Sequence, residues 1–250
     1  MLRFSKITRL SDSYEKIVIA LGTFDGIHIG HQSILRRAQE LAGDIHGLSM
    51  AFTFQEHPLS VLFPGRAPKK IRDTASKEEI IEALGVDILM NVPFNHDFSA
   101  ISPVGFLKLL QENFAPSYIV VGTNYTFGFQ GKGDISFLES EGRNYGFIPQ
   151  IGKSVQRDGK MVSSTLVRAL IAEGELSRVN DYLKWPLSYT GIVVYGQQRG
   201  RTLGFPTANV SLDDSYALLP NGVYAVNVHL MGKIWQGVAN IGSNPTFGGK

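Results

Sequence analysis

Residues 16–31 read KIVIALGTFDGIHIGH, and this stretch constrains the architecture more than any other. After the first lysine comes a continuous apolar run, typical of a strand buried on both faces of a parallel sheet. Glycines then predict a tight turn, and apolar residues at helical spacing over 31–42 predict a helix. A turn from strand to helix places unpaired backbone N–H groups and the positive end of the helix dipole together. The stretch therefore indicates phosphate chemistry.

Strand and helix patterns continue to alternate through the first part of the chain. We expect strands at 48–54, 86–94 and 117–122 and helices at 76–84, from 102 onward, at 134–141, at 165–173 and at 175–183. Ser76 and Glu79 could form a capping box, Pro103 follows Ser102 at a helix start, and Asp158-Gly159 predicts a hairpin turn. This order predicts an α/β fold with a doubly wound parallel sheet.

The character of the chain changes after Trp185-Pro186. Beyond that point strands are expected at 189–195, 222–230 and 233–241, separated by Gly, Pro and Asn. We therefore divide the chain into an α/β domain, residues 1–186, and an all-β domain, residues 187–250.

Composition narrows the class of protein. Lys and Arg number 24 against 22 Asp and Glu, and without a dense basic block this balance gives no argument for a nucleic-acid partner. The chain has no cysteine, which excludes disulfides, thiolate metal sites and a cysteine nucleophile. Its N-terminus lacks the apolar segment of a signal peptide, and no stretch is apolar enough to span a bilayer. We predict a cytoplasmic protein without a membrane partner.

His28 and His31 are the first candidate catalytic pair. Residues three apart share a helix face, so both imidazoles can donate hydrogen bonds to a phosphate whose charge grows during attack. Gly30 would let a nucleotide approach the backbone. The alternative is that both histidines cap or solvate a loop. A zinc site has less support, because no third histidine stands at ligand spacing.

A second cluster begins the helix expected near residue 165. Residues 163–168 read SSTLVR, with hydroxyls at the helix start and an arginine one turn later, an arrangement suited to a polyphosphate. A plain Ser/Thr cap with a solvated arginine is the alternative.

Taken together, these motifs resemble the bacterial bifunctional riboflavin kinase/FAD synthetase family. The resemblance rests on GTFDGIHIGH at 22–31, TFQEHP at 53–58, GTNYTFG at 122–128, SSTLVR at 163–168, GFPTAN at 204–209, PNGVY at 220–224 and GVANIG at 237–242. It covers nearly the whole chain.

For the first domain, the resemblance implies an FMN adenylyltransferase (FAD synthetase) that transfers AMP from ATP to FMN and releases pyrophosphate. It assigns His28 and His31 to the ATP phosphates and the transition state. The implied ATP- and FMN-binding residues are Gly22, Phe24, Asp25, Gly30, Asn124, Ser164, Thr165 and Arg168. Asn124 would contact phosphate or Mg²⁺, but many relatives carry Asp there, and an amide offers the metal no carboxylate. Many relatives also carry Arg at the position of Leu166.

For the second domain, the resemblance implies a small riboflavin kinase barrel that phosphorylates riboflavin to FMN. Thr207 and Asn209 would bind Mg²⁺ and ATP, and the segment around Gly204 would cover the phosphates. Family members continue past the position of Lys250, and their further segment brings a glutamate base. We therefore expect the barrel in this chain to be incomplete and its kinase activity to be impaired.

Several residues and two functions stay open. His57 and Pro58 match the family but are as consistent with a structural turn, and Phe127 and Phe129 could wall a flavin site or pack in the core. The isolated histidines at 46, 96 and 229 are interpreted as surface or packing residues.

One alternative function is another H-x-G-H nucleotidyltransferase, acting on a phosphopantetheine, nicotinamide mononucleotide or a phosphorylated polyol, although GFPTAN argues against it. The other is a flavin-sensing module without kinase activity.

Overall fold

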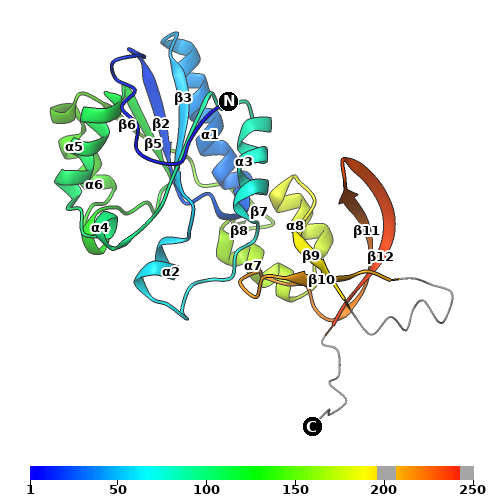
Figure 1. Ribbon diagram of the computed structural model, residues 1–250. Coiled ribbons are helices and arrows are strands. Elements are labelled where there is room, and N and C mark those ends of the chain that lie inside the picture. The colour runs from blue at the N-terminus through cyan, green and yellow to red at the C-terminus, as the bar shows by residue number, and fades with distance from the viewer. Residues whose placement is uncertain (196–206, 243–250) are drawn as a thin grey trace.

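A six-stranded parallel sheet forms the centre of the N-terminal part in the computed structural model, which describes residues 1–195 and 207–242 (Figure 1). The strand order is β1-β4-β3-β2-β5-β6, and the strands are β1 (Leu2–Phe4), β2 (Ile17–Leu21), β3 (Leu48–Phe54), β4 (Ile88–Val92), β5 (Tyr118–Val121) and β6 (Ile148–Ile151). The predicted doubly wound α/β fold is confirmed. The two edge strands were not expected, because β1 has three residues and β6 contains Pro149, which weakens a strand pattern.

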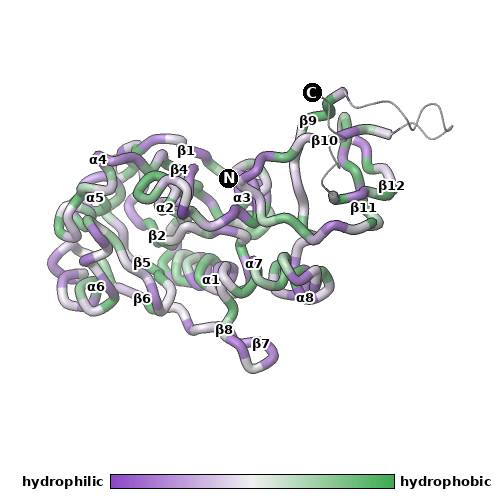
Figure 2. The backbone as a smooth tube through the Cα atoms, turned by 90° about the horizontal axis from the view of Figure 1, so that it is seen from below, coloured by the Kyte–Doolittle hydropathy of each residue, from purple (hydrophilic) through white to green (hydrophobic). Residues whose placement is uncertain are grey.

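Helices cover both faces of this sheet. Successive residues of β2 point to opposite faces: Ile17 and Ile19 join one buried cluster, and Val18 and Ala20 join another. The first cluster includes residues of α5 (Pro103–Phe114) and α6 (Ile135–Glu141), and the second includes residues of α1 (Ile29–Asp44) and α3 (Thr74–Ala83). Figure 2 shows the mixed apolar and polar sequence of α1, whose apolar residues pack on the sheet. Burial on both faces explains the continuous apolar run at 17–21.

Side-chain caps set where these helices begin. Ser102 accepts a hydrogen bond from the Gly105 N–H at 3.0 Å, and Pro103 takes the first helical position, as predicted. The predicted capping box at residue 76 is wrong: α3 begins at Thr74, and the Asp73 carboxylate accepts from the Ser76 N–H at 2.7 Å. Asp73 was available three residues before the expected start and is as good a cap as serine.

Shorter elements complete the N-terminal part. They are α2 (Pro58–Leu62), α4 (His96–Ser99), α7 (Ser164–Ala172), α8 (Leu176–Leu183), the hairpin of β7 (Gln156–Arg157) and β8 (Lys160–Met161), and single 3-10 turns at Asp25–Ile27, Phe129–Gly131 and Gly142–Tyr145. The predicted hairpin turn is confirmed, with φ of 51° at Asp158 and 71° at Gly159. Across the described ranges, no helix has the length and apolar character needed to cross a membrane.

Antiparallel strands form the C-terminal part. β9 (Gly191–Val194) pairs with β10 (Asn209–Leu212), and β11 (Gly222–Leu230) pairs with β12 (Lys233–Ile241). The expected all-β character is confirmed, although β10 was missed because its four residues follow a run of turn formers. Between β10 and β11 the chain returns to the N-terminal part, where Ala217 and Leu219 pack with Ile71 and residues of α7 and α8. The two parts therefore share a buried cluster.

Candidate active site

The candidate site is a cleft of about 1180 Å³ at the carboxyl ends of the central strands. Its walls come from the loops that follow β2, β3, β4 and β5 and from the start of α7. Ligands of open α/β sheets bind at this edge, where the strand order reverses. The order β3-β2-β5 reverses at β2, so the loop after β2 lies at that switch point.

The loop after β2 has an unusual backbone. Phe24 has φ of 48° and Ile27 has φ of 45°, and a positive φ is especially unfavourable for a β-branched side chain. Both side chains are fully buried. The Gln32 side chain donates to the carbonyl oxygens of Ile27 at 2.9 Å and Leu183 at 2.7 Å. Burial and this amide bridge hold the strained loop in the conformation that delivers His28 to the start of α1.

The two histidines lie side by side, as predicted. His28 is the N-cap residue of α1, and its ring stacks on His31 with centroids 3.7 Å apart and planes at 18°. The backbone N–H of His31 donates to His28 Nδ1 at 3.3 Å, so the neutral His28 ring carries its hydrogen on Nε2. Phe24 packs edge-on against His31 at 5.5 Å. These contacts fix the orientation of both rings.

Both imidazoles are neutral at physiological pH. Burial, with a smaller contribution from the Arg168 charge, lowers the pKa of His28 to about 4. Burial also lowers the pKa of His31 well below its usual value, and the neighbouring His28 and Lys77 add to the effect. His31 Nδ1 is buried and has no hydrogen-bond partner among the described residues. The pair therefore offers N–H donors rather than fixed charges.

Gly30 lies directly against the His28 ring. A Cβ at this position would lie 3.1 Å from Cε1 and Nδ1 of His28. Sequence analysis predicts a glycine here so that a nucleotide can approach the backbone, and contact with the His28 ring is a second reason for it. Gly22 is similar, because a Cβ there would lie 2.8 Å from the Phe24 ring.

Arg168 reaches the cleft from α7 and is already engaged by the protein. Its guanidinium forms an ion pair with Asp25, and its Nε donates to the Lys69 carbonyl at 2.6 Å. Asp25 pairs with Arg168, which lines the cleft, but Asp25 itself is not among the lining residues. Ser164 donates to the Asp25 carbonyl at 3.0 Å, and Ser164 and Thr165 both line the cleft. The predicted residues of α7 and of the first loop thus form one cluster.

Asn124 lines the same cleft from the loop after β5 and is exposed. In the part of the chain that the structure describes, no group of three or more His, Cys, Asp or Glu side chains could hold a metal ion. Thr123 and Thr126 of the same loop also line the cleft and offer hydroxyl oxygens but no carboxylate. A divalent ion would therefore take most of its ligands from a bound polyphosphate, which is how Mg²⁺ is commonly held.

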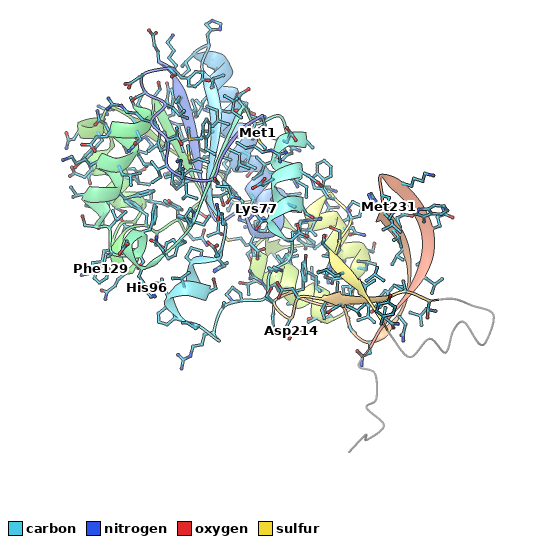
Figure 3. The ribbon with its side chains drawn as sticks, in the orientation of Figure 1. Met1, Lys77, His96, Phe129, Asp214 and Met231 are labelled. Carbon is cyan, nitrogen blue, oxygen red and sulfur yellow. The ribbon has the colours of Figure 1, made fainter. Side chains whose placement is uncertain are left out.

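Phe127 and Phe129 were expected either to wall a flavin site or to pack in the core, but sequence reasoning missed the larger aromatic wall to which they belong. Phe54 packs against Phe94 and Phe98 with centroid distances of 5.0 and 5.2 Å, and all three line the cleft. Phe127 is buried in the core and also reaches the cleft, and Phe129, labelled in Figure 3, is 43% exposed beside it. Their signal was present in the sequence, because Phe54 and Phe94 stand at the carboxyl ends of two predicted buried strands.

Two further basic side chains, His57 and Lys77, lie at or near the cleft. His57 caps α2 by accepting from the Leu59 N–H at 3.2 Å and lines the cleft, so it combines a structural role with access to a ligand. Lys77 of α3 is buried and donates to the Phe54 carbonyl at 2.6 Å, and burial lowers its pKa to about 8 (Figure 3). No motif marks Lys77 in the sequence.

The second predicted site lies apart from this cleft. Asn209 begins β10 and pairs with Val194 of β9, and Thr207 precedes it by two residues. Both are exposed, and neither lines the cleft. Gly204 lies outside the described residues.

Comparisons with known proteins agree across both parts of the chain. The FAD synthetase family model matches residues 10–166, and the riboflavin kinase model matches residues 183–250. A Bacillus subtilis protein named bifunctional riboflavin kinase/FMN adenylyltransferase is 37% identical over 95% of this chain and 75% of its own length. An Escherichia coli protein of the same name is 35% identical over 94% of this chain and 75% of its own.

A solved structure has the same fold over almost the whole chain. It is titled a macrolide-efflux protein from Streptococcus pneumoniae, is 30% identical, and covers 99% of this chain and 81% of its own with a TM-score of 0.82. Its title names a different activity from the one that both family models and the relatives above share.

Proposed function

The chain belongs to the bifunctional riboflavin kinase/FMN adenylyltransferase family, and from this premise we propose that the cleft described above is where AMP passes from ATP to FMN. One observation carries the proposal: a stacked pair of neutral histidines at the start of α1 shares a cleft with an aromatic wall. The first feature suits a phosphate, and the second suits a flavin ring.

The phosphates of ATP would lie at the starts of α1 and α7. Both helices present N–H groups there, and the positive ends of their dipoles favour an anion. His28 Nε2–H, the Thr165 hydroxyl and the Arg168 guanidinium are donors on the same wall. Arg168 would keep its contact with Asp25 on one edge and use its remaining N–H groups for phosphate oxygens.

The isoalloxazine ring of FMN would lie against the aromatic wall. Phe54, Phe94, Phe98 and Phe129 offer ring edges and faces that a planar flavin can pack on. This end of the cleft is joined to the histidine end, so the FMN phosphate can reach the α-phosphate of ATP.

The reaction needs no protein nucleophile. An oxygen of the FMN phosphate attacks the α-phosphorus of ATP, and the bond to the bridging oxygen of pyrophosphate breaks. Negative charge grows on the non-bridging and leaving oxygens, where the histidine N–H groups stabilise it. Mg²⁺, held by Asn124 Oδ1 and the ATP phosphates, would neutralise charge on the leaving pyrophosphate.

The C-terminal part carries the riboflavin kinase function of the family. We assign Thr207 and Asn209 to Mg²⁺ and ATP, supported by the GFPTAN signature and by their exposure at the start of β10. The expected impairment of this kinase stays a prediction, and FMN formation from riboflavin and MgATP measures it. A cytoplasmic location also stays a prediction, supported by the absence of cysteine.

Product analysis tests the adenylyl assignment. The chain is incubated with MgATP and, in separate reactions, FMN, nicotinamide mononucleotide and a phosphopantetheine. We expect FAD and pyrophosphate with FMN alone. Turnover of another acceptor in preference to FMN would instead assign the cleft to a different H-x-G-H nucleotidyltransferase. Binding of FMN without any product would favour the flavin-sensing alternative.

A further inference from the structure

Residues 69–73 lie between the adenylyl site and a segment of the kinase-matched region. On one side they touch the loop after β2 and α7, and on the other they pair with residues 213–217. Ile71, at their centre, is fully buried. Gly26 packs so closely on Ile71 that a Cβ at position 26 would lie 2.9 Å from its Cδ1. A shift of residues 69–73 would therefore displace the loop that carries the catalytic histidines.

On the adenylyl side, the backbone of residues 69–71 binds both members of the Asp25–Arg168 pair. The Ile71 N–H donates to Asp25 Oδ1 at 3.1 Å, while Asp25 Oδ2 pairs with the guanidinium. Arg168 Nε donates to the Lys69 carbonyl at 2.6 Å. The position of this short stretch of backbone therefore sets where the guanidinium lies. An Arg side chain alone has rotamer freedom that these contacts remove.

On the other side, residues 213–217 add a strand-like bridge. Lys70 and Tyr216 form a parallel bridge, in which the Lys70 N–H donates to the Ser215 carbonyl at 2.7 Å and the Ala217 N–H donates to the Lys70 carbonyl at 2.9 Å. The labelled Asp214 marks this segment in Figure 3, and its carbonyl accepts from the Lys69 ammonium. The kinase-matched region thus fixes the register of residues 69–73.

Tyr216 makes side-chain contacts that stabilise this bridge. Its side chain is buried, its hydroxyl donates to Asp73 Oδ2 at 2.9 Å, and the Lys70 ammonium lies 4.3 Å from its ring centroid. Burial, together with the bond to Asp73, raises the pKa of Tyr216 to about 12, so the phenol keeps its proton and remains a donor. Tyr216 thereby holds residues 70 and 73 at once.

We propose that Tyr216 is a positioning residue of the adenylyl transfer: through residues 69–73 it holds Asp25 and Arg168 where the guanidinium meets the ATP phosphates. A side chain in the kinase-matched region thus sets the affinity of the adenylyl site for ATP. The inference rests on the proposed function, in which Arg168 binds those phosphates.

Two variants and a matched control test the proposal. Tyr216→Phe removes the hydroxyl, with its bond to Asp73 and the longer bond it accepts from the Thr190 N–H at 3.4 Å, and Tyr216→Ala also removes the ring over Lys70. Tyr182→Phe is the control, because it removes a phenol that bonds to the Arg157 carbonyl and the Asp158 carboxylate, in the apolar cluster that also contains Ile71, and it does not touch Asp73 or Lys70. Steady-state FAD formation gives KM for MgATP at saturating FMN. We expect it to rise roughly three- to tenfold in the Tyr216 variants, with the KM for FMN unchanged.

A double-mutant cycle separates positioning from general destabilisation. In an Arg168→Lys background, Tyr216→Ala should add little to the KM for MgATP, because the group it positions is already gone. An unchanged KM in both Tyr216 variants would overturn the proposal. A Tyr216→Ala effect in the Arg168→Lys background as large as in the unaltered chain would overturn it too.

Hydrogen exchange followed by mass spectrometry gives a readout that needs no turnover. We expect faster exchange in peptides covering residues 69–73 in the Tyr216 variants, and exchange at the wild-type rate in Tyr182→Phe. If the unaltered chain forms no FAD, the proposed function is wrong. The exchange rates then still test whether Tyr216 holds residues 69–73 in place. Unchanged exchange there would contradict the link.

Discussion

His28 and His31 act through N–H groups whose hydrogen bonds strengthen as charge grows on the phosphate. We expect His28→Ala and His31→Ala each to lower kcat for FAD formation by a factor of roughly 100 to 1,000, with a smaller change in the KM for ATP. Steady-state assays of pyrophosphate release measure both constants. His96→Ala is the control, because His96 is exposed and outside the cleft. Near-normal kcat in both folded variants would reject the site.

Arg168 makes two contacts that a lysine cannot make together. Its Nε reaches the Lys69 carbonyl while a terminal nitrogen pairs with Asp25, and an ammonium has no such planar fork. Arg168→Lys should therefore raise the KM for MgATP in adenylyl transfer about tenfold or more and leave phosphorylation of riboflavin unchanged. Superimposable ATP titrations of the two proteins would show that Arg168 is only a surface charge.

Protonation of the buried histidines should weaken the fold in mild acid. The pKa of His28 is about 4 in the folded protein and 6.5 when exposed, so the unfolded chain binds more protons between these values. Stability from His28 is fully present above pH 6.5 and falls as the pH drops toward 4, by roughly 3 kcal/mol in total. Urea unfolding from pH 7 to 4.5 measures it. His28→Asn should show a shallower pH dependence, and an identical slope would contradict the assignment.

At the scale of elements, Gln32 connects α1, the strained loop and the end of α8. Gln32→Met keeps the length of the side chain but leaves the carbonyls of Ile27 and Leu183 buried without this donor. We expect the free energy of unfolding to fall by about 2–5 kcal/mol, from two unsatisfied acceptors. Gln39→Met, on the same helix, removes one partly buried bond to the Leu84 carbonyl and should cost less. Equal losses in urea unfolding would argue against the amide bridge.

Most elements could be predicted because their signals are local. The apolar run at 17–21 and the Ser102-Pro103 pair mark a strand and a helix start through burial and capping alone. The edge strands β1 and β6 could not be predicted, because they have only three and four residues and form by pairing with strands far along the chain. The positive φ of Ile27 could not be predicted either, because tertiary packing enforces a conformation that an isoleucine by itself disfavours.

The part of the site that could be predicted consists of residues whose type and position in the sequence indicate phosphate binding. His28 and His31 stand at a helix start, and their stacking follows from the spacing. The sequence did not reveal that Asp25 pairs with Arg168, since this pair joins residues 143 positions apart. Nor did it reveal the bridge between Lys70 and Tyr216, which ties the adenylyl site to the kinase-matched region.

At the scale of the whole molecule, two activities share one chain and one buried cluster. α7 and α8 pack on the N-terminal part and also on Ala217 and Leu219 of the C-terminal part. The residues assigned to ATP and FMN in the cleft lie before residue 169, whereas Thr207 and Asn209, assigned to the kinase, lie after it. FMN supplied directly should therefore enter the adenylyl reaction without passing through the kinase site.

If FMN is adenylylated in the cleft that holds His28 and His31, formation of FAD depends on His28. The most direct test is chromatography of the products that the unaltered chain and the His28→Ala variant form from FMN and MgATP. We expect FAD and an equal amount of pyrophosphate from the unaltered chain, and at least about a hundredfold slower formation of both by the folded variant. No FAD from the unaltered chain, or equal rates for the two proteins, would contradict this assignment of the cleft.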